Sequence, residues 1–368
     1  MKVDDLNKKL VGLFFVSSIL TLIGLIFIYS SSSVYALEHY KDSAFFFKKQ
    51  LMAVFIGIIG FLFCKKISIQ FLEKNAIWLV VGGLGITCLG FIPRFALKVH
   101  GSSRWISIAG MSFQPSEFLI PAVLFFCAAF LAKRTTAPTL FTRSSIPGGL
   151  LLGIVFIILL KQPDFGAAIT LFSSMAVLLF VTGLEIRYLL YVVLAIAPFI
   201  AVLVYTKAYR LQRIMIFLNP WADPRGKGFQ IIQSLIAIGS GQILGQGISA
   251  SRQKFFYLPM QHTDFIFSII AEETGLMGGV FLILLFILFC YFGIGIVMRL
   301  KHAFGRFLVL GFISLITVRA VINLMVASGL LPTKGLGLPF ISYGGSAIIC
   351  IFCMLGLIAN VVKFEESH

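Results

Sequence analysis

Long apolar runs recur along nearly the whole chain, and they limit the choice of fold more than any other feature of the sequence. A bilayer core takes roughly 20 helical residues to cross, and no backbone N–H or C=O group can be left unpaired in hydrocarbon. The runs therefore predict transmembrane helices. We expect about ten, near residues 11–31, 50–64, 75–93, 113–132, 147–161, 166–184, 188–206, 273–298, 303–326 and 341–362.

The remainder of the chain leaves little room for a soluble domain. Only 12% of the 368 residues are charged, whereas an ordinary soluble domain carries roughly 25%. We expect one all-α, polytopic membrane domain over residues 1–368. The first apolar run is longer than the roughly 7 to 15 residues of a signal-peptide core, so we interpret it as a retained anchor. All six cysteines lie in apolar runs, which argues against disulfides and a thiolate metal site.

The distribution of basic residues predicts which side each loop occupies. An even number of spans places both termini on one side, and the inner segments hold more Lys and Arg than the short outer loops if that side is cytoplasmic. The polar segment at about 207–272, between the seventh and eighth spans, is then a large extracytoplasmic loop. Its hydrophobic stretch at 231–238 argues against disorder, so we expect short interfacial or re-entrant helices there.

The net charge of +16 is compatible in principle with nucleic acid binding. The basic residues are spread over short loops on both sides, however, so anionic lipid headgroups or a phosphorylated lipid substrate are the expected partners, and nucleic acid is not. Basic residues on the outer side oppose correct insertion, which indicates that something outside requires positive charge. Interfacial snorkelling of long side chains is the alternative.

Carboxylates are scarce enough for elimination to be informative. Asp264 follows His262 and Thr263 directly before an apolar run. Partial desolvation at such a boundary raises the pKa of a carboxyl group towards that of a general base. A helix N-cap is the competing interpretation, and the sequence does not decide between the two. Of the 14 acidic residues, six lie beside a proline, a glycine or a membrane boundary: Glu117, Asp164, Asp223, Asp264, Glu272 and Glu273.

Other polar residues flank the predicted spans. Arg104 and Trp105 precede Gln114 and Glu117 at the start of the fourth span. A cation, an indole and an acid together suit ligand binding, and an interfacial anchor with first-turn helix chemistry is the alternative. Arg319, inside the ninth span, must face protein or water, and we expect it to form a buried ion pair.

Two outer segments carry further candidates. Arg210 and Arg213 share one helix face, which suits diphosphate oxygens or lipid headgroups. Lys161 and Asp164 occupy a tight outer corner that a proline turn with an ion pair also explains. The motifs GxxxxGK[ST], GxGxxG after a strand, HExxH and GxSxG are absent, so ATP-driven transport, nicotinamide chemistry, zinc proteolysis and serine hydrolysis have no support.

Short motifs occur in order along almost the whole chain. They comprise Arg104-Trp105, Gln114-Pro-Ser-Glu117, Gln162-Pro-Asp164, Asn219-Pro-Trp-Ala-Asp-Pro224, the segment 228–234, Leu258-Pro259, His262-Thr-Asp-Phe-Ile-Phe267, Glu272-Glu273, Pro332-Thr-Lys-Gly335 and the segment 338–346. Taken together they resemble the SEDS family of bacterial shape, elongation, division and sporulation proteins. Within it, the segments 332–335 and 221–224 are more similar to the division branch than to the elongation branch. Asn219 departs from the Asp that many relatives carry there.

The resemblance implies ten helices with cytoplasmic termini in a bacterial cytoplasmic (inner) membrane. It implies that the chain polymerises lipid II into peptidoglycan strands on the extracytoplasmic side, with a class B penicillin-binding protein and other division-complex membrane proteins as partners. It makes Asp264 the essential acid and the outer loop much of the active site. The expected substrate-binding residues are Arg104, Trp105, Gln114, Glu117, Lys161, Asp164, Arg210, Arg213, Gln233, His262, Glu273, Lys334 and Ser342.

Such a reaction is an inverting attack by a sugar hydroxyl on the anomeric carbon of a second sugar, whose leaving group is polyprenyl diphosphate. It needs a base near the hydroxyl and positive charge near the diphosphate. We expect Asp264 to be the base. Arg210 and Arg213, with Arg104 or Lys334, are the expected source of positive charge.

Three points stay open at the level of the sequence. A divalent cation, Mg or Mn, is a candidate cofactor, with Asp264, Glu273 or Asp164 as oxygen ligands. An elongation-type polymerase and a flippase for the lipid precursor are alternative functions, because intramembrane charges and broken helices also mark transporters. A scaffold that only recruits division proteins is a third.

Overall fold

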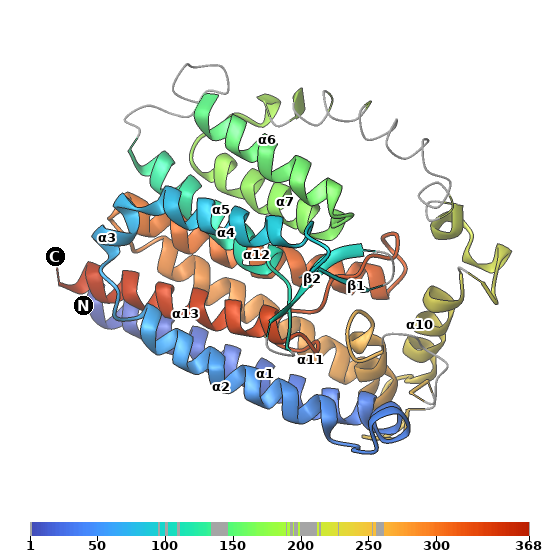
Figure 1. Ribbon diagram of the computed structural model, residues 1–368. Coiled ribbons are helices and arrows are strands. Elements are labelled where there is room, and N and C mark those ends of the chain that lie inside the picture. Colours follow the sequence, from blue (N-terminus) through green and yellow to red (C-terminus); the bar gives the residue numbers. More distant parts are fainter. Residues whose placement is uncertain are drawn as a thin grey trace.

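The computed structural model is a bundle of long helices whose two termini lie at the same end (Figure 1). It describes residues 2–94, 96–99, 102–108, 111–133, 146–188, 190–191, 194, 198, 212, 215–226, 228–251, 253–254 and 261–367. The helices are α1 (Lys2–Tyr40), α2 (Phe45–Cys64), α3 (Ile69–Lys74), α4 (Ala76–Leu89), α5 (Ser116–Ala132), α6 (Ile146–Lys161), α7 (Phe165–Val181), α10 (Phe229–Ser240), α11 (Ile266–Val297), α12 (Ala303–Ala327) and α13 (Gly345–Glu366).

The expected membrane spans coincide with these helices. Helices α1, α2, α11, α12 and α13 are each long and apolar enough to cross a membrane. Helices α4 to α7 are also apolar but shorter, at 14 to 17 residues. Nine of the ten predicted spans match a described helix, and the seventh, at 188–206, lies mostly outside the described residues. The chain is a multi-pass membrane protein.

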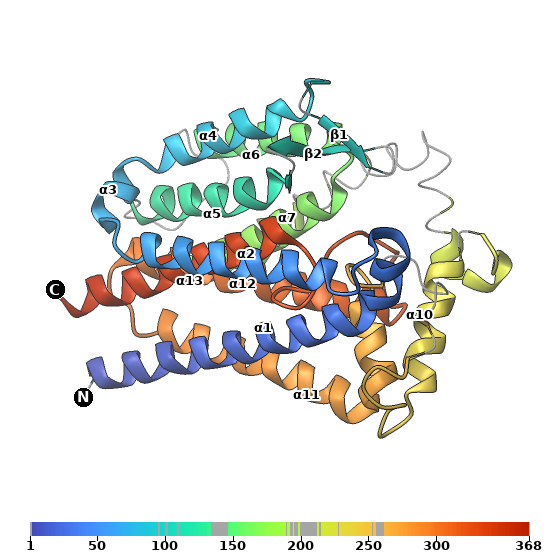
Figure 2. The ribbon, with the colours of Figure 1, turned by 60° about the horizontal axis from the view of Figure 1, so that its bottom comes forward.

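Helix α12 is the central helix of the bundle. It contacts α5, α7, α11 and α13, while α13 packs along α2 and α1 packs along α11 (Figures 1 and 2). Phe304 and Phe312 of α12 are fully buried. At the end that carries the termini, Asp5 pairs with Arg299 and Asn7 donates to Glu366, so both ends of the chain are tied to the bundle.

A small antiparallel sheet, which the sequence did not predict, precedes α5. Its strands are β1 (Ala96–Val99), β2 (Ser102–Ile108) and β3 (Met111–Phe113), in the order β1-β2-β3. Trp105 pairs with Leu97, and Ile106 pairs with both Ala96 and Phe113. The buried side chain of Ile106 anchors the sheet, which brings Trp105 and Gln114 to the start of α5.

Helix α11 begins at Ile266 and is interrupted at Gly275, so the loop predicted at about 207–272 ends at residue 265. Gly275 has φ 68° and ψ −166°, a conformation open essentially to glycine alone. The interruption frees carbonyl groups on its N-terminal side. Gln246 N and Gly247 N donate to the carbonyls of Glu272 and Glu273, at 2.9 and 3.0 Å.

The glycine-rich segment 241–247 also pairs with the other side of the interruption. Leu276 N donates to the carbonyl of Gln242 at 2.8 Å. A Cβ atom on Gly245, whose φ is 82°, would lie 2.7 Å from Gly275 N. Two glycines are needed because the two backbone segments approach too closely for any side chain. The interruption is therefore a built feature in which lost helix hydrogen bonds are replaced.

We predict that Gly275→Ala will destabilise the protein by roughly 1–3 kcal/mol or more, since alanine is strained in this conformation and its Cβ would lie 2.5 Å from the Ile243 carbonyl oxygen. Thermal unfolding in detergent measures the change. Gly85→Ala on α4 is the matched control, because a Cβ atom there would lie more than 4 Å from every described atom outside its own stretch of helix. Equal unfolding temperatures for the two variants would contradict this account.

Candidate active site

A cavity of about 640 Å³ lies at the end of the bundle opposite the termini, where α2, α5, α7, α11 and α13 all begin. The residues that line it come from segments far apart in the sequence. Its polar and charged lining comprises Lys49, Trp105, Ser112, Gln114, Glu117, Asp164, His262, Thr263, Asp264, Arg319, Ser342, Tyr343 and Ser346. The tertiary fold thus gathers much of the expected site into one space.

The backbone of the segment that carries Asp264 is held by neighbouring elements. The carbonyls of residues 262, 263 and 264 each accept one hydrogen bond, from Tyr343 N at 2.9 Å, Ser342 Oγ at 2.5 Å and Asn323 Nδ2 at 2.8 Å in that order. Ser342 Oγ also accepts from Leu338 N at 2.7 Å. The turn before α13 and the outer half of α12 therefore fix the position of Asp264.

Asp264 does not occupy the N-cap position of α11. The N-cap is Phe265, which makes no side-chain capping bond. The alternative of an aspartate N-cap is therefore not supported by the helix start that the structure shows. The Asp264 side chain is partly buried and belongs to the lining of the cavity.

His262 lies among aromatic rings at the start of the segment 262–264, which carries Asp264. Its ring centroid is 4.5 Å from that of Phe46, 5.8 Å from Tyr343 and 6.0 Å from Tyr35. Burial lowers the pKa of His262 to about 4, because a charged imidazole loses its hydration there. The ring is neutral at physiological pH, so His262 can shape the cavity and donate or accept one hydrogen bond, but it adds no positive charge.

Arg319 forms the buried ion pair that its place in the ninth span predicted. Its Nη1 and Nη2 atoms lie 2.5 and 2.7 Å from the two carboxylate oxygens of Glu117 in the first turn of α5. Both residues are 8% exposed. Each charge neutralises the other, so this pair joins α5 to α12 in the wall of the cavity and leaves little net charge for a ligand.

Asp164 caps α7 and also organises the neighbouring segment. Its Oδ1 accepts from Ala167 N at 3.2 Å, and its Oδ2 accepts from Ser116 Oγ at 2.9 Å and Gln114 Nε2 at 3.2 Å. Gln114 N in turn donates to Ser346 Oγ at 3.1 Å. The predicted proline turn at 162–164 is present, and its aspartate connects the starts of α5 and α7.

Lys49 is a cavity residue that the sequence reasoning missed. It lines the cavity together with Met52, Ala53 and Ile56, and this spacing describes one face of α2. Its Nζ lies 4.3 Å from the centroid of the Phe45 ring. The sequence shows a lysine at the start of a predicted span. That this lysine faces a cavity becomes clear only when the helix that packs against the span, α13, is known. Between Lys49 and Ile56 the face descends by roughly 10 Å.

The other predicted substrate-binding residues are not gathered in this cavity. Lys161 is the exposed last residue of α6, which packs on the outside of α5 and α7. Gln233 lies on α10, and Lys334 is partly buried in the segment before α13, and neither lines the cavity. The side chains of Arg104, Arg210 and Arg213 lie outside the described part of the structure.

Glu273 is part of a separate buried cluster. It accepts two hydrogen bonds from Ser30 Oγ, at 2.7 and 2.8 Å, and its Oε1 lies 3.6 Å from Lys254 Nζ. Glu273 therefore joins α11 to α1 and to the outer loop. The expectation that it contacts substrate came from its place at a membrane boundary, and the interruption at Gly275 directs it elsewhere.

The carboxylates of the site do not form a metal-binding cluster by themselves. Among the described residues, no group of three or more His, Cys, Asp or Glu side chains is placed to hold a metal ion. Of the three ligands expected from the sequence, Glu273 is in the cluster with Lys254, and Asp164 is engaged by Ser116, Gln114 and Ala167. Asp264 is the third expected ligand, and it lines the cavity.

The fold and the site define a class of protein: a polytopic α-helical membrane protein with an acid, a lysine and an apolar wall in one cavity at a membrane boundary. A sequence model of the FtsW/RodA/SpoVE family, described as "Cell cycle protein", matches residues 11–367, and the chain belongs to this family. It is 41% identical to the probable peptidoglycan glycosyltransferase FtsW of Geobacter sp. (strain M18), over 93% of this chain and 94% of that protein.

Solved structures agree with this assignment. One is a chain of the structure described as "Structural coordination of polymerization and crosslinking by a peptidoglycan synthase complex". It has a TM-score of 0.80 and 29% identity over 97% of this chain and 98% of that chain. The rod shape determining protein RodA of Thermus thermophilus has a TM-score of 0.70 and 25% identity over 96% of each chain.

The buried ion pair gives a testable consequence. We predict that Glu117→Gln will lower the free energy of unfolding by about 3–5 kcal/mol, because it leaves the Arg319 guanidinium buried without a counter-charge. Glu185→Gln is the matched control, since Glu185 pairs with Arg187 where both side chains are more than half exposed, and such pairs contribute roughly 0–1 kcal/mol. Thermal unfolding of both variants in detergent measures the difference, and similar losses would disprove the structural role of the pair.

Proposed function

We infer that this chain is a peptidoglycan glycosyltransferase of the division type, which polymerises lipid II into glycan strands. Membership of the FtsW/RodA/SpoVE family supports the enzyme class, and the higher identity to the FtsW relative than to RodA supports the division type. The single observation that carries the chemistry is one cavity with Asp264 and Lys49 at its polar part and an apolar wall beneath them.

The shape of the cavity suits a substrate that is half lipid and half sugar diphosphate. The apolar wall is formed by Met52 and Ile56 of α2 and by Ile348 and Ile351 of α13. A polyprenyl tail lying against this wall would stay within hydrocarbon, where its burial is favourable. Its diphosphate and sugars would then lie at the level of Lys49, His262 and Asp264.

We propose that Asp264 is the general base. The carboxylate would take the proton from the attacking sugar hydroxyl as the new bond to the anomeric carbon forms, and the diphosphate would leave with the electrons of the broken C–O bond. The three hydrogen bonds to the carbonyls of 262–264 support this role, because catalysis by a positioned base depends on its geometry.

Lys49 is the proposed source of positive charge for the leaving diphosphate among the described residues. Arg319 also lines the cavity, but its charge is compensated by Glu117. Lysine binds phosphate as a compact point charge with three donors, and its flexible stem can follow a leaving group. The arginines at 104, 210 and 213 stay candidates for the same task.

We also propose a divalent cation as a candidate source of positive charge for the diphosphate. The described residues supply Asp264 as its acidic ligand, and the oxygens of a bound diphosphate would have to complete the coordination, as is usual for Mg²⁺. We therefore assign the neutralisation of the leaving group to the chain's own cations.

We also propose the orientation and the partner. The cavity lies opposite both termini, so cytoplasmic termini, favoured by the distribution of basic residues, would make the cavity face the outer side of the cytoplasmic membrane. A class B penicillin-binding protein is the proposed cross-linking partner. The structural relative from a work on a peptidoglycan synthase complex supports an assembly of this type.

The decisive test of the base is Asp264→Asn in a polymerisation assay with purified protein and lipid II. We predict a loss of glycan polymer of at least about 100-fold, the lower range for removal of a general base, with unchanged thermal unfolding. Asp42→Asn is the control, since Asp42 pairs with Lys48 on a short outer loop. Full polymer formation by the Asp264 variant would refute the mechanism. Movement of labelled lipid II across vesicles without polymer would instead favour a flippase.

A second prediction separates Lys49 from its neighbour. Lys49→Met should lower kcat/KM for lipid II on the order of tenfold, since a hydrogen bond to a charged group contributes roughly 1.5–3 kcal/mol. Lys48→Met removes the same charge one residue earlier, where the lysine pairs with Asp42 outside the cavity lining. Steady-state polymerisation kinetics of both variants measure the effect, and equal kcat/KM values would exclude Lys49 from the site.

A further inference from the structure

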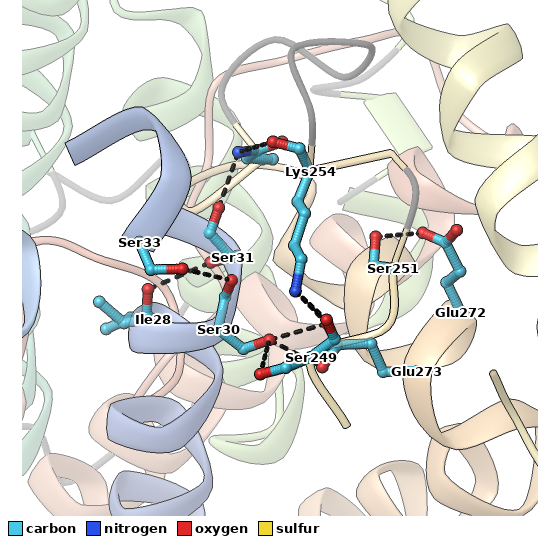
Figure 3. A network of polar contacts seen from close by, with 10 residues as sticks. Ile28, Ser30, Ser31, Ser33, Ser249, Ser251, Lys254, Glu272 and Glu273 are labelled. Carbon is cyan, nitrogen blue, oxygen red and sulfur yellow. Dashed lines mark hydrogen bonds and ion pairs between the residues drawn. The ribbon is translucent and has the colours of Figure 1, made fainter. Parts of the chain in front are cut away.

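A buried ion pair connects the loop after α10 to α11 (Figure 3). Lys254 Nζ is 3.6 Å from Glu273 Oε1, with the two side chains 5% and 0% exposed. Ser30 Oγ donates to both oxygens of the same carboxylate and lies 3.4 Å from Ser249 Oγ. Lys254 also donates to the Ser249 carbonyl. Three elements therefore meet here: the outer end of α1, the start of α11 and the loop between α10 and α11.

The cluster fixes the loop immediately before the proposed base. Gln261 Nε2 donates to the carbonyl of Ser31 at 2.7 Å and to the carbonyl of Lys254 at 3.1 Å. Gln261 directly precedes the segment 262–264. Lys254 is thus connected to α11 through Glu273 and to the start of the Asp264 segment through Gln261.

The other side of the cluster is held by backbone contacts. Glu273 lies two residues before the interruption at Gly275, and its carbonyl accepts from Gly247 N at 3.0 Å. Its carboxylate position is therefore set by the backbone of the glycine-rich segment and not by the ion pair alone. Glu273 is a fixed anchor, and Lys254 is the loop residue bound to it.

We propose that Lys254 and Glu273 are positioning residues for Asp264. Their ion pair holds Lys254 against α11, and Ser30 connects α1 to the same carboxylate. Through the bonds of Gln261 to the carbonyls of Lys254 and Ser31, the cluster sets where the segment 262–264 begins. This inference rests on the proposed function of Asp264 as the base. Neither Lys254 nor Glu273 lines the cavity in the described structure, so their effect on catalysis acts through the position of the base and not through contact with substrate.

The two buried charges of this pair depend on each other. Removing one partner would leave the other charge buried without compensation, whereas removing both charges avoids that cost. The double variant Lys254→Met/Glu273→Gln should therefore fold with an unfolding temperature close to that of the unmodified protein. Its glutamine can still accept from Ser30, but the attraction that holds Lys254 against α11 is lost.

The test measures kcat and KM for lipid II polymerisation by this double variant. We expect kcat to fall on the order of 10- to 100-fold, because small displacements of a catalytic group have effects of this size, and KM to change by less than about twofold, since the substrate contacts are intact. The matched control is Asp5→Asn/Arg299→Met, which neutralises an ion pair at the opposite end of the bundle and should leave kcat unchanged.

A covalent replacement distinguishes positioning from any other role. In the double variant, Ser30→Cys and Ser249→Cys place thiols where the two hydroxyl oxygens are 3.4 Å apart, and oxidation by copper phenanthroline and oxygen should join α1 to the loop. We expect the disulfide to restore most of the lost kcat, and a reductant to abolish the recovery. Ser30→Cys alone should show no recovery on oxidation.

The outcomes separate this inference from the proposed function. The positioning role is overturned if kcat is unchanged in the double variant, or if kcat falls and the disulfide fails to restore it. An inactive Asp264→Asn variant would still support Asp264 as the base in either case. An active Asp264→Asn variant would overturn the base itself.

Discussion

A membrane interior offers no water to pair with backbone polar groups, and the active-site end of this protein is built around that constraint. Non-helical backbone occurs there in the segment 262–264 and at Gly275. Each interruption is matched by a specific partner. The carbonyls of 262–264 receive Tyr343, Ser342 and Asn323, and the carbonyls freed at Gly275 receive the segment 241–247.

Buried charged side chains, like the buried backbone groups, each have a specific partner. Glu117 with Arg319, and Lys254 with Glu273, are buried as pairs, so each costly desolvated charge has its counter-charge in contact. These pairs connect elements and contribute little net field. The cavity lining therefore contains the compensated pair Glu117 and Arg319 together with Lys49, Asp164 and Asp264.

The combination of an apolar wall and a polar rim explains why the reaction suits a membrane-embedded enzyme. A polyprenyl diphosphate cannot leave the bilayer without exposing its tail, so the catalytic groups must be held at the membrane boundary. Helices α2 and α13 supply the wall, and the segments before α11 and α13 supply the rim.

Much of the fold could be predicted from the sequence, because hydropathy alone determines where helices must form in lipid. Nine of ten spans match described helices, and the boundary expected at 273 falls beside the interruption at Gly275 within α11. Local chemistry also indicated Asp264, Glu117, Asp164 and the buried pairing of Arg319. The three-stranded sheet before α5 was not predicted, since its strands are short and lie in a segment whose pattern is neither long nor apolar.

The sequence by itself determined that this chain is a membrane protein and which segments cross the membrane. It also indicated which acidic residues lie where burial of a charge is unfavourable, and these were the candidates for a function. The tertiary structure alone decided which of those residues meet. Lys49 lines the cavity because α2 packs along α13, whereas Glu273 leaves the expected site for a cluster with Lys254 because α11 is interrupted two residues later. Contacts between residues hundreds of positions apart depend on how helices pack and where their backbones deviate, and no local pattern of residue types encodes that information.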